Sequence, residues 1–366
     1  MILEIVRRTP NIMRSAVAPC TNLTQPSVHR IIDALLDAQL LTLGDPVIHG
    51  RGKPSPSLKL NADARYAIGV SVNTDSITFG LCDFSCRIIH EEMLDMSPAH
   101  RRDTLFSLKE RLRAVLAARG VTNEKIVGIG FSMAGFFIGP DRHFNSPELL
   151  RDWSLVDLRR ELETLFDLPV WTENNGTTGA IGESAVGAGR TYATFGYLSF
   201  NYGFGGGIVL DGKPFFGAFG NAGELSRVYT MKEGASRPAL GELLKRLDKG
   251  GIAIANIREL RQRFDPSWPQ VAEWVEEVTP ALNRTIDMLR AVIDPEAIVF
   301  GGELPRALGE LLIAAPPSPG EPRYGLDAPY PRKLLSSIEA DPAVLGAALI
   351  PLMDRYFAWS LPRSSP

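Results

Sequence analysis

The residues 172–183 are the part of this chain best suited to bind a polyhydroxylated ligand. They read TENNGTTGAIGE and offer a carboxylate, two amides and several hydroxyl groups. Amides and hydroxyls both donate and accept hydrogen bonds, as sugar hydroxyls do. Asn174 and Asn175 cannot take a proton from a hydroxyl group, so the stretch is poorly supplied with a general base. The pattern therefore favours recognition of a ligand over its chemical conversion.

The elements around this stretch are expected to place it at the end of a strand. The residues 168–171 are apolar, and small residues that suit a helix start follow from Gly176. In α/β proteins, ligands bind at polar loops of this kind. Alternating strands and helices on both sides predict two α/β layers. We expect strands at residues 68–72, 77–81, 86–89, 126–131, 192–200, 208–210 and 297–300, and helices at 101–119, 155–166, 240–247, 252–264, 270–293, 305–314 and 341–357.

A second group of chemically suitable residues lies near the N-terminus. Thr24 is placed to cap a helix in which apolar residues recur at helical spacing from Val28 to Leu36. Short helical segments at 3–8 and 11–17 precede it, and a hairpin with the basic tip GRGKP follows. This order is typical of a winged helix-turn-helix, although a small protein-interaction unit would look similar. The expected DNA contacts are Thr24, Gln25, Ser27, His29 and Arg30 on the third helix, and Arg51 and Lys53 on the wing.

The distribution of charge supports a separate N-terminal unit. Residues 1–60 hold seven Lys and Arg and four Asp and Glu, whereas the remainder holds 32 and 38. A basic segment on an acidic body favours nucleic-acid binding by the segment and another task for the body. No apolar run approaches the roughly 20 residues that span a bilayer. The three cysteines, Cys20, Cys82 and Cys86, form no disulfide framework, so we expect a cytoplasmic protein without a membrane partner.

Several motifs in a fixed order resemble one known family. The chain contains GRGKPSPSLKLN, YAIGVSVNTDSITFGLCDF, VGIGFSMAGFF, NSPELLRDW, ENNGTTGAIGE, FNYGFGGGIVLDG, GNAGELSRV and IDPEAIVFGGEL. Together they resemble the ROK family (repressors, open reading frames and sugar kinases), in particular its DNA-binding repressor branch. The resemblance implies an α/β protein with a winged helix-turn-helix in residues 1–60 and a two-lobed actin-like (ribonuclease H-like) sugar-kinase fold. One lobe would comprise residues 64–178 and 340–366, and the other residues 179–339.

The chain departs from the family's kinases at the positions that serve phosphoryl transfer. The Asp that opens the first phosphate hairpin is Ser71 here, and one of the hairpin's glycines is Asn73. The catalytic base is Asn175 instead of Asp, and the second phosphate loop begins Asn201-Tyr202 instead of Gly-Thr. Phosphoryl transfer depends on positioning, charge stabilisation and a carboxylate that orients the nucleophile. We therefore expect no catalytic residue and no cofactor.

The family's zinc site is altered as well. The family uses a His and three clustered cysteines, whereas this chain has Ser226 at the His position and no Cys after Cys86. A zinc site without these soft ligands is not credible, so we expect no metal. The resemblance assigns contacts with a sugar to Asn145, Glu148, Asn174, Asn175 and Glu224.

These observations predict a transcriptional regulator of carbohydrate metabolism, a repressor that binds double-stranded operator DNA. A sugar or sugar derivative in a catalytically inactive cleft would change lobe closure, or the spacing of DNA-binding units in a homodimer or tetramer. Two alternatives remain open. One is an ATP-dependent sugar kinase with a DNA-binding head. The other is a DNA-binding scaffold that does not respond to any ligand.

Overall fold

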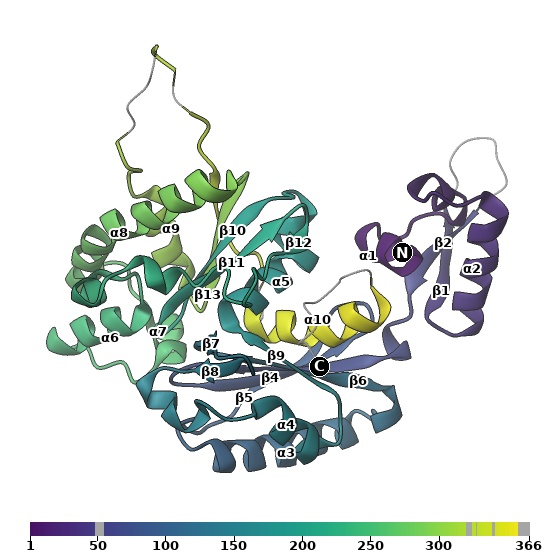
Figure 1. Ribbon diagram of the computed structural model, residues 1–366, viewed down its shortest axis with the longest axis horizontal. Helices are drawn as coiled ribbons and strands as arrows, with labels where there is room; N and C mark the ends of the chain where they lie inside the picture. Colours follow the sequence, from purple (N-terminus) through teal and green to yellow (C-terminus); the bar gives the residue numbers. More distant parts are fainter. Residues whose placement is uncertain (48–54, 320–323, 327, 339–340, 358–366) are drawn as a thin grey trace.

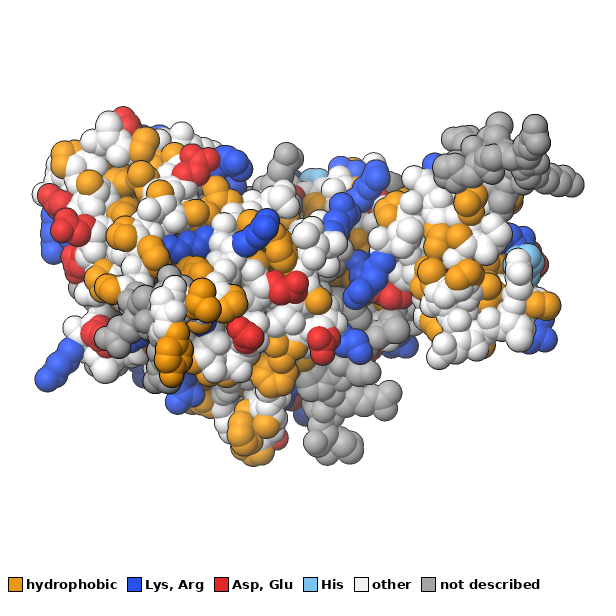
Figure 2. All heavy atoms as spheres, turned by 90° about the horizontal axis from the view of Figure 1, so that it is seen from above, with side chains coloured by type: hydrophobic (Ala, Val, Ile, Leu, Met, Phe, Trp, Pro, Cys, Tyr) orange, Lys and Arg blue, Asp and Glu red, His pale blue; other side chains and the backbone are white. Residues whose placement is uncertain are grey.

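The computed structural model describes residues 1–47, 55–319, 324–326, 328–338 and 341–357. It consists of a head, residues 1–60, and a body of two α/β lobes (Figure 1). The head projects from one side of the body (Figure 2). Within the described ranges, no helix is long and apolar enough to cross a membrane.

The head contains α1 (Ile2–Arg8), α2 (Gln25–Asp37) and the antiparallel strands β1 (Leu41–Val47) and β2 (Ser55–Leu60). Thr24 is the N-cap of α2, as predicted, and Pro26 lies in its first turn, where no backbone N–H is needed. The helix predicted at residues 11–17 is wrong. Two 3-10 turns stand there instead, η1 (Arg14–Ala16) and η2 (Ala18–Cys20), because the preceding residues pair with β2. Leu58 N donates to Ile12 O at 2.9 Å, which holds this segment extended.

The first lobe is a five-stranded sheet in the order β5-β4-β3-β6-β9. Its strands are β3 (Tyr66–Val72), β4 (Ile77–Asp83), β5 (Ile88–Met93), β6 (Ile126–Met133) and β9 (Val170–Asn174). The helices α3 (Arg101–Ala118) and α4 (Leu158–Phe166) and the small hairpin β7 (Phe136–Ile138) and β8 (His143–Asn145) complete it. The helix predicted from residue 155 begins three residues later. Leu155 has a left-handed φ of 60°, and the Asp157 side chain caps α4 by accepting from Arg160 N at 3.1 Å.

The second lobe repeats this plan in the order β12-β11-β10-β13-β14. Its strands are β10 (Phe195–Phe200), β11 (Phe204–Leu210), β12 (Lys213–Pro214), β13 (Ala297–Gly302) and β14 (Arg332–Leu335). Its helices are α6 (Leu240–Lys249), α7 (Ile257–Arg263), α8 (Pro269–Ile293) and α9 (Arg306–Ala314). The helix α7 starts later than predicted because the Asn256 side chain caps it, accepting from Glu259 N at 2.9 Å.

Two helices, α5 (Asn175–Val186) and α10 (Pro342–Tyr356), lie between the two sheets (Figure 1). The helix α5 follows the last strand of the first lobe but packs on β10 and β11 of the second. Conversely, α10 follows the second lobe and packs on β3 and β6 of the first. The two helices cross at Gly346, where a Cβ atom would lie 1.7 Å from Thr178 O, so glycine is required. Each lobe is therefore covered by a helix that the other lobe supplies.

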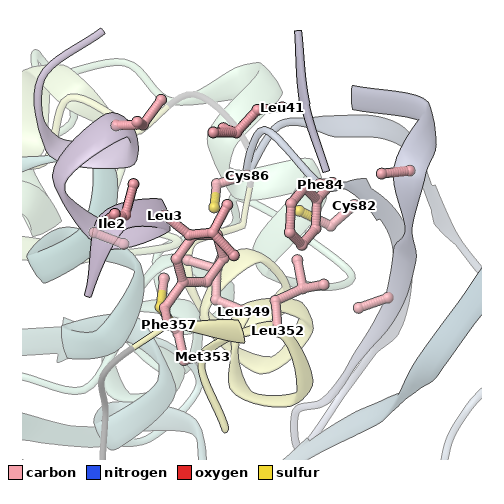
Figure 3. Packing of buried hydrophobic residues seen from close by; sticks show 14 of the residues in the cluster. Ile2, Leu3, Leu41, Cys82, Phe84, Cys86, Leu349, Leu352, Met353 and Phe357 are labelled. Carbon is pink, nitrogen blue, oxygen red and sulfur yellow. The ribbon is translucent and has the colours of Figure 1, made fainter. Parts of the chain in front are cut away.

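The apolar core of the head continues into the body (Figure 3). Ile2 and Leu3 of α1 belong to the same buried cluster as Phe84, after β4, and Met353 and Phe357 at the end of α10. The cluster also includes apolar residues of α2, β1 and β2. Burial of this much apolar surface at a junction fixes the position of α1 against both parts. The head is thus joined to the body by packing as well as by the chain.

Candidate functional site

Asn174 and Glu224 meet where the two lobes face each other at the start of α5. The Asn174 Oδ1 caps α5 by accepting from Gly176 N at 2.7 Å and Thr177 N at 3.2 Å. The Asn174 Nδ2 donates to Gly135 O in the first lobe and, at 3.4 Å, to Oε2 of Glu224 in the second lobe. Both side chains are half-buried. The pair therefore combines a fixed position with access for a ligand.

Glu224 supplies the carboxylate of this pair. It immediately precedes the short helix η7 (Leu225–Val228), and its Oε1 accepts a hydrogen bond from Ser226 Oγ. Burial raises the pKa of Glu224 above its ordinary value, while Ser226, Arg227 and Asn174 offset part of this rise. An ionised carboxylate has about four acceptor positions, of which the protein uses only some. Glu224 can therefore accept hydrogen bonds from ligand hydroxyls.

Asn175 differs from its neighbour because it is buried and its side chain bonds to the first lobe, whereas the Asn174 side chain also reaches the second. Its side chain is only 5% exposed. Its Nδ2 donates to Val72 O at 3.0 Å and to Asn73 Oδ1 at 2.7 Å, and its Oδ1 accepts from Ser132 Oγ. Both amide hydrogens are used, which leaves little capacity for a ligand. In this position, Asn175 fastens the start of α5 to β3 and β6.

Asn73 extends these bonds across to the second lobe. Its Nδ2 donates to Oε1 of Glu303, which directly follows β13, at 3.4 Å. Burial, together with the charges of Asp341 and Asp75, raises the pKa of Glu303 to about 8. Burial also raises the pKa of Asp341. The start of α5 is thus surrounded on this side by buried amides and carboxyl groups, and burial favours the neutral form of these carboxyl groups.

Two other predicted sugar contacts lie on the first lobe near β8. The side chain of Asn145 is exposed, and its backbone passes Gly135 so closely that a Cβ atom there would lie 2.7 Å from Asn145 O. Asn145 is therefore adjacent to the carbonyl that Asn174 contacts. Glu148 opens η5 (Glu148–Trp153), and its side chain is 85% exposed and pairs with Arg151 at 3.7 Å. The structure joins Asn174 and Glu224 directly but directs Glu148 to the surface.

Sequence reasoning missed Asn221, which makes the most regular contact between the lobes. Its Oδ1 accepts from Phe137 N and its Nδ2 donates to Phe137 O, both at 2.8 Å. A side-chain amide that pairs with both backbone groups of one residue acts as an added strand partner. The two residues are 84 positions apart, so spacing alone gave no sign of their contact. Asn221 belongs to the motif GNAGELSRV, and this membership was the only feature of the sequence that pointed to it.

The predicted DNA-contacting residues of α2 differ in exposure. Thr24, Gln25 and Arg30 are exposed, whereas Ser27 and His29 are half-buried. The hydroxyl oxygens of Thr24 and Ser27 lie 3.0 Å apart, and the buried Nε2 of His29 has no hydrogen-bond partner within the described part of the chain. Gln25 and Arg30 are therefore the best-placed side chains for an outside partner. Arg51 and Lys53 lie outside the described residues.

Ser226, where the resemblance places a zinc-binding His, forms a hydrogen bond within the protein. Its hydroxyl donates to Oε1 of Glu224. Across the ranges that the structure describes, no group of three His, Cys, Asp or Glu side chains is arranged to hold a metal ion. The loop that carries Glu224 is instead fixed by side-chain and backbone hydrogen bonds, including one from Leu225 N to Gly223 O at 2.7 Å.

Comparisons with known proteins agree with this architecture. The uncharacterized protein y4fQ of Sinorhizobium fredii is 26% identical over 363 residues, which cover 97% of this chain and 91% of that protein. A xylose repressor of Caldicellulosiruptor bescii is 27% identical over 301 residues, 77% of this chain and 71% of that protein. A solved ROK family transcriptional regulator, a homolog of the E. coli MLC protein, has a TM-score of 0.66 at 17% identity and covers 96% of this chain and 95% of its own. A family model described as ROK family matches residues 67–315, more than half of the sequence, and the chain therefore belongs to the ROK family.

Proposed function

We propose that this protein is a sugar-responsive transcriptional repressor whose body binds a sugar without phosphorylating it. The state of Asn175 carries this proposal. At the position where the resemblance places the catalytic base, the chain has a buried amide that is hydrogen-bonded to Val72, Asn73 and Ser132. An amide cannot accept the proton of a sugar hydroxyl, and this one cannot turn towards a ligand without breaking three hydrogen bonds.

The surroundings of Asn175 also disfavour a bound nucleoside triphosphate. Asn73, in the hairpin that would hold phosphate, reaches across to Glu303. Glu303 and Asp341 are both buried carboxyl groups at this end of the cleft. Phosphate groups carry negative charge and need cationic or N–H donors. The charges that act on Glu303 are mainly those of Asp341 and Asp75, and the charge of Arg261 offsets them only in part. The kinase alternative would require these side chains to move apart.

The sugar would bind on the other side of the cleft, between Asn174 and Glu224. Their 3.4 Å contact is long for a hydrogen bond, so ligand hydroxyls that replace it recover or improve the bonding. A half-buried amide and carboxylate suit neutral polyols through paired hydrogen bonds. The relatives named xylose repressor make D-xylose the first effector to test.

The head would bind operator DNA as a winged helix-turn-helix. The helix α2 presents Gln25 and Arg30 on its exposed side, while Val28 and Ile32 are buried in the head. Arg and Gln are suited to contact guanine and adenine edges in the major groove. A sugar that separates Asn174 from Glu224 alters the relation of the two lobes, and a dimer would convert this change into altered spacing of two heads.

Calorimetric titration with D-xylose and other pentoses and hexoses tests the sugar site, and a coupled assay for ADP tests the kinase alternative. We expect saturable binding of at least one sugar and no sugar-dependent ADP formation. Sugar-dependent ADP formation would establish the kinase instead. If the chain binds DNA but none of these sugars, the scaffold that ignores ligands replaces the proposal.

A further inference from the structure

Helix α5 connects the candidate sugar site to the junction between the head and the body. Its first residue follows Asn174, which contacts Glu224, and its last turn contains Ala185. Twelve helical residues extend about 18 Å at 1.5 Å per residue. The helix is therefore long enough to carry a displacement from the cleft to the head.

The packing of α5 allows it to move only as a unit. All residues from Asn175 to Ala185 are buried. At Gly176 a Cβ atom would lie 2.2 Å from Gly206 O, and at Gly179 it would lie 2.3 Å from the ring of Tyr197. Contacts this close prevent the helix from rotating or bending locally without moving its neighbours. A push at its first turn must therefore appear at its last turn.

Arg7 of α1 forms a hydrogen bond with that last turn, beside the apolar cluster that Ala185 shares with α1. Its Nη1 donates to Ala185 O at 2.9 Å, one of the carbonyl groups that a helix leaves without an internal partner. A cation at this end of a helix is also favoured by the helix dipole. The Arg7 side chain is only 5% exposed, and Glu4 holds it through two hydrogen bonds of 2.8 Å. This geometry fixes the guanidinium between the head and the body.

The helix α1 transmits the position of Arg7 to the rest of the head. Ile2, Leu3 and Val6 are buried in the cluster that contains Val28 and Ile32 of α2, the proposed DNA-contacting helix. The same cluster reaches Met353 and Phe357 of the body (Figure 3). A movement of α1 therefore cannot leave the orientation of α2 unchanged.

We propose that Arg7 is the residue through which α5 controls the orientation of the head. A ligand that shifts the first turn of α5 displaces Ala185 O at its far end, Arg7 follows, and α1 turns the head. This inference rests on the proposed function, because it assigns to α5 the task of passing effector binding to the DNA-binding unit. The device itself consists only of protein contacts, so it can be tested without DNA or sugar.

The test measures the distance between nitroxide labels on the head and the body by pulsed electron resonance. Cys20 is exposed and the other two cysteines are buried, so Cys20 takes one label selectively. Arg113→Cys on α3 supplies the second site, since the Arg113 side chain is 67% exposed. Asn174→Asp provides the perturbation. It keeps the capping oxygen but turns the Nδ2 donor into an oxygen that faces Gly135 O and Glu224, which repels the start of α5.

We expect Asn174→Asp to shift the mean distance by about 2 Å or more, the scale of helix displacements in allosteric transitions. Arg7→Met should abolish this shift. Arg8→Met is the matched control and should preserve it, because Arg8 also binds Glu4, at 2.7 Å, but its side chain is 51% exposed on the surface. Arg7→Met leaves the Glu4 carboxylate without its buried partner, which can prevent folding. In that case the double variant Arg7→Met and Glu4→Gln removes both charges, and it should abolish the shift in the same way.

An equal shift in the Arg7→Met and Arg8→Met backgrounds would overturn the inference, as would the absence of any shift with Asn174→Asp alone. Failure of the proposed function would give a result distinct from failure of this inference. In that case neither sugar nor DNA binds, while the distance measurement still reports whether α5 and the head move together.

Discussion

The two sides of the cleft use the same kind of side chain for opposite purposes. On the sugar side, Asn174 is half-buried and faces Glu224 over a long contact of 3.4 Å. On the phosphate side, Asn175 is buried and bonded to Asn73 at 2.7 Å. Both amides donate two hydrogen bonds, but one of the Asn174 bonds is the long contact with Glu224, which a ligand hydroxyl can replace. At the position where the resemblance places a catalytic carboxylate, the buried amide of Asn175 is held by partners in the first lobe.

The largest effect should follow from restoring the carboxylate on the phosphate side. In Asn175→Asp, an oxygen replaces Nδ2 and faces Val72 O and Asn73 Oδ1, which are both acceptors. A buried charge without a partner costs about 3–5 kcal/mol. We expect the free energy of unfolding in urea to fall by about this amount, and kinase activity to remain absent.

Asn145→Asp is the matched control for this measurement. Asn145 is exposed, so the same chemical change there should alter stability by less than about 0.5 kcal/mol. Equal stability of Asn175→Asp and the wild type would show that the amide network is not required. Sugar-dependent ADP formation by Asn175→Asp would contradict the account of the phosphate side altogether.

The next effect concerns the sugar side. Glu224→Ala removes the carboxylate that faces Asn174, and hydrogen bonds to charged groups contribute about 1.5–3 kcal/mol. We expect calorimetry to show a loss of D-xylose affinity of about 100-fold. Glu148→Ala should leave the affinity within about twofold, because that side chain points to the surface. Comparable losses in both variants would contradict a sugar site at Glu224.

The dependence of the free energy of unfolding on pH tests whether Glu303, on the side of Asn175, is protonated in the folded protein. Burial raises the pKa of Glu303 from its ordinary 4.5 to about 8, so the folded state holds the proton more tightly than the unfolded state. The stability gained by this is fully present below pH 4.5 and is lost as the pH rises towards 8. Glu303→Gln keeps the acceptor for Asn73 and cannot ionise.

Glu303→Gln removes the cost of ionising a buried carboxyl group near Asp341, so we expect the variant to be more stable than the wild type at pH 9, by about 2 kcal/mol. At pH 5 the variant and the wild type should unfold at similar urea concentrations. A variant that is less stable than the wild type at pH 9 would contradict a protonated Glu303 in the folded state.

The smallest effect is expected on the head. Arg30→Ala removes an exposed cation of α2 and should weaken binding of a selected operator duplex about 10-fold, with a reduced dependence on salt. Arg113→Ala on α3 serves as the control, since it removes an exposed cation from the body. Fluorescence anisotropy measures both. Equal weakening by the two substitutions would indicate only general attraction of DNA to positive charge.

Much of the body was predictable because its strands are continuous apolar runs separated by clear turns. Of the predicted strands, residues 68–72 lie within β3 (Tyr66–Val72) and residues 297–300 lie within β13. The errors occurred where one polar side chain decides a helix start. Asp157 and Asn256 each cap a helix later than the apolar pattern suggested. In the head, pairing of Ile12 with Leu58 overrode the helical pattern of residues 11–17.

The site was less predictable because its contacts join distant segments. Asn73 and Asn175 each stood out in the sequence, but their bond spans 102 positions and follows only from the parallel pairing of β3 with β6 and of β6 with β9. The contact of Asn221 with Phe137 depends on how two separate lobes face each other. The role of Glu303 required the burial of its carboxyl group, which no local pattern reveals.

The central claim is that binding of a sugar on one side of the cleft controls binding of DNA by the head. The most direct measurement is the fluorescence anisotropy of a DNA duplex obtained by in vitro selection against this chain. The duplex is titrated with protein, once without sugar and once with saturating D-xylose or another pentose or hexose. We predict that at least one sugar raises the Kd for the duplex by 10-fold or more, on the order of 1.4 kcal/mol of coupling free energy. An unchanged Kd with every sugar would contradict the account.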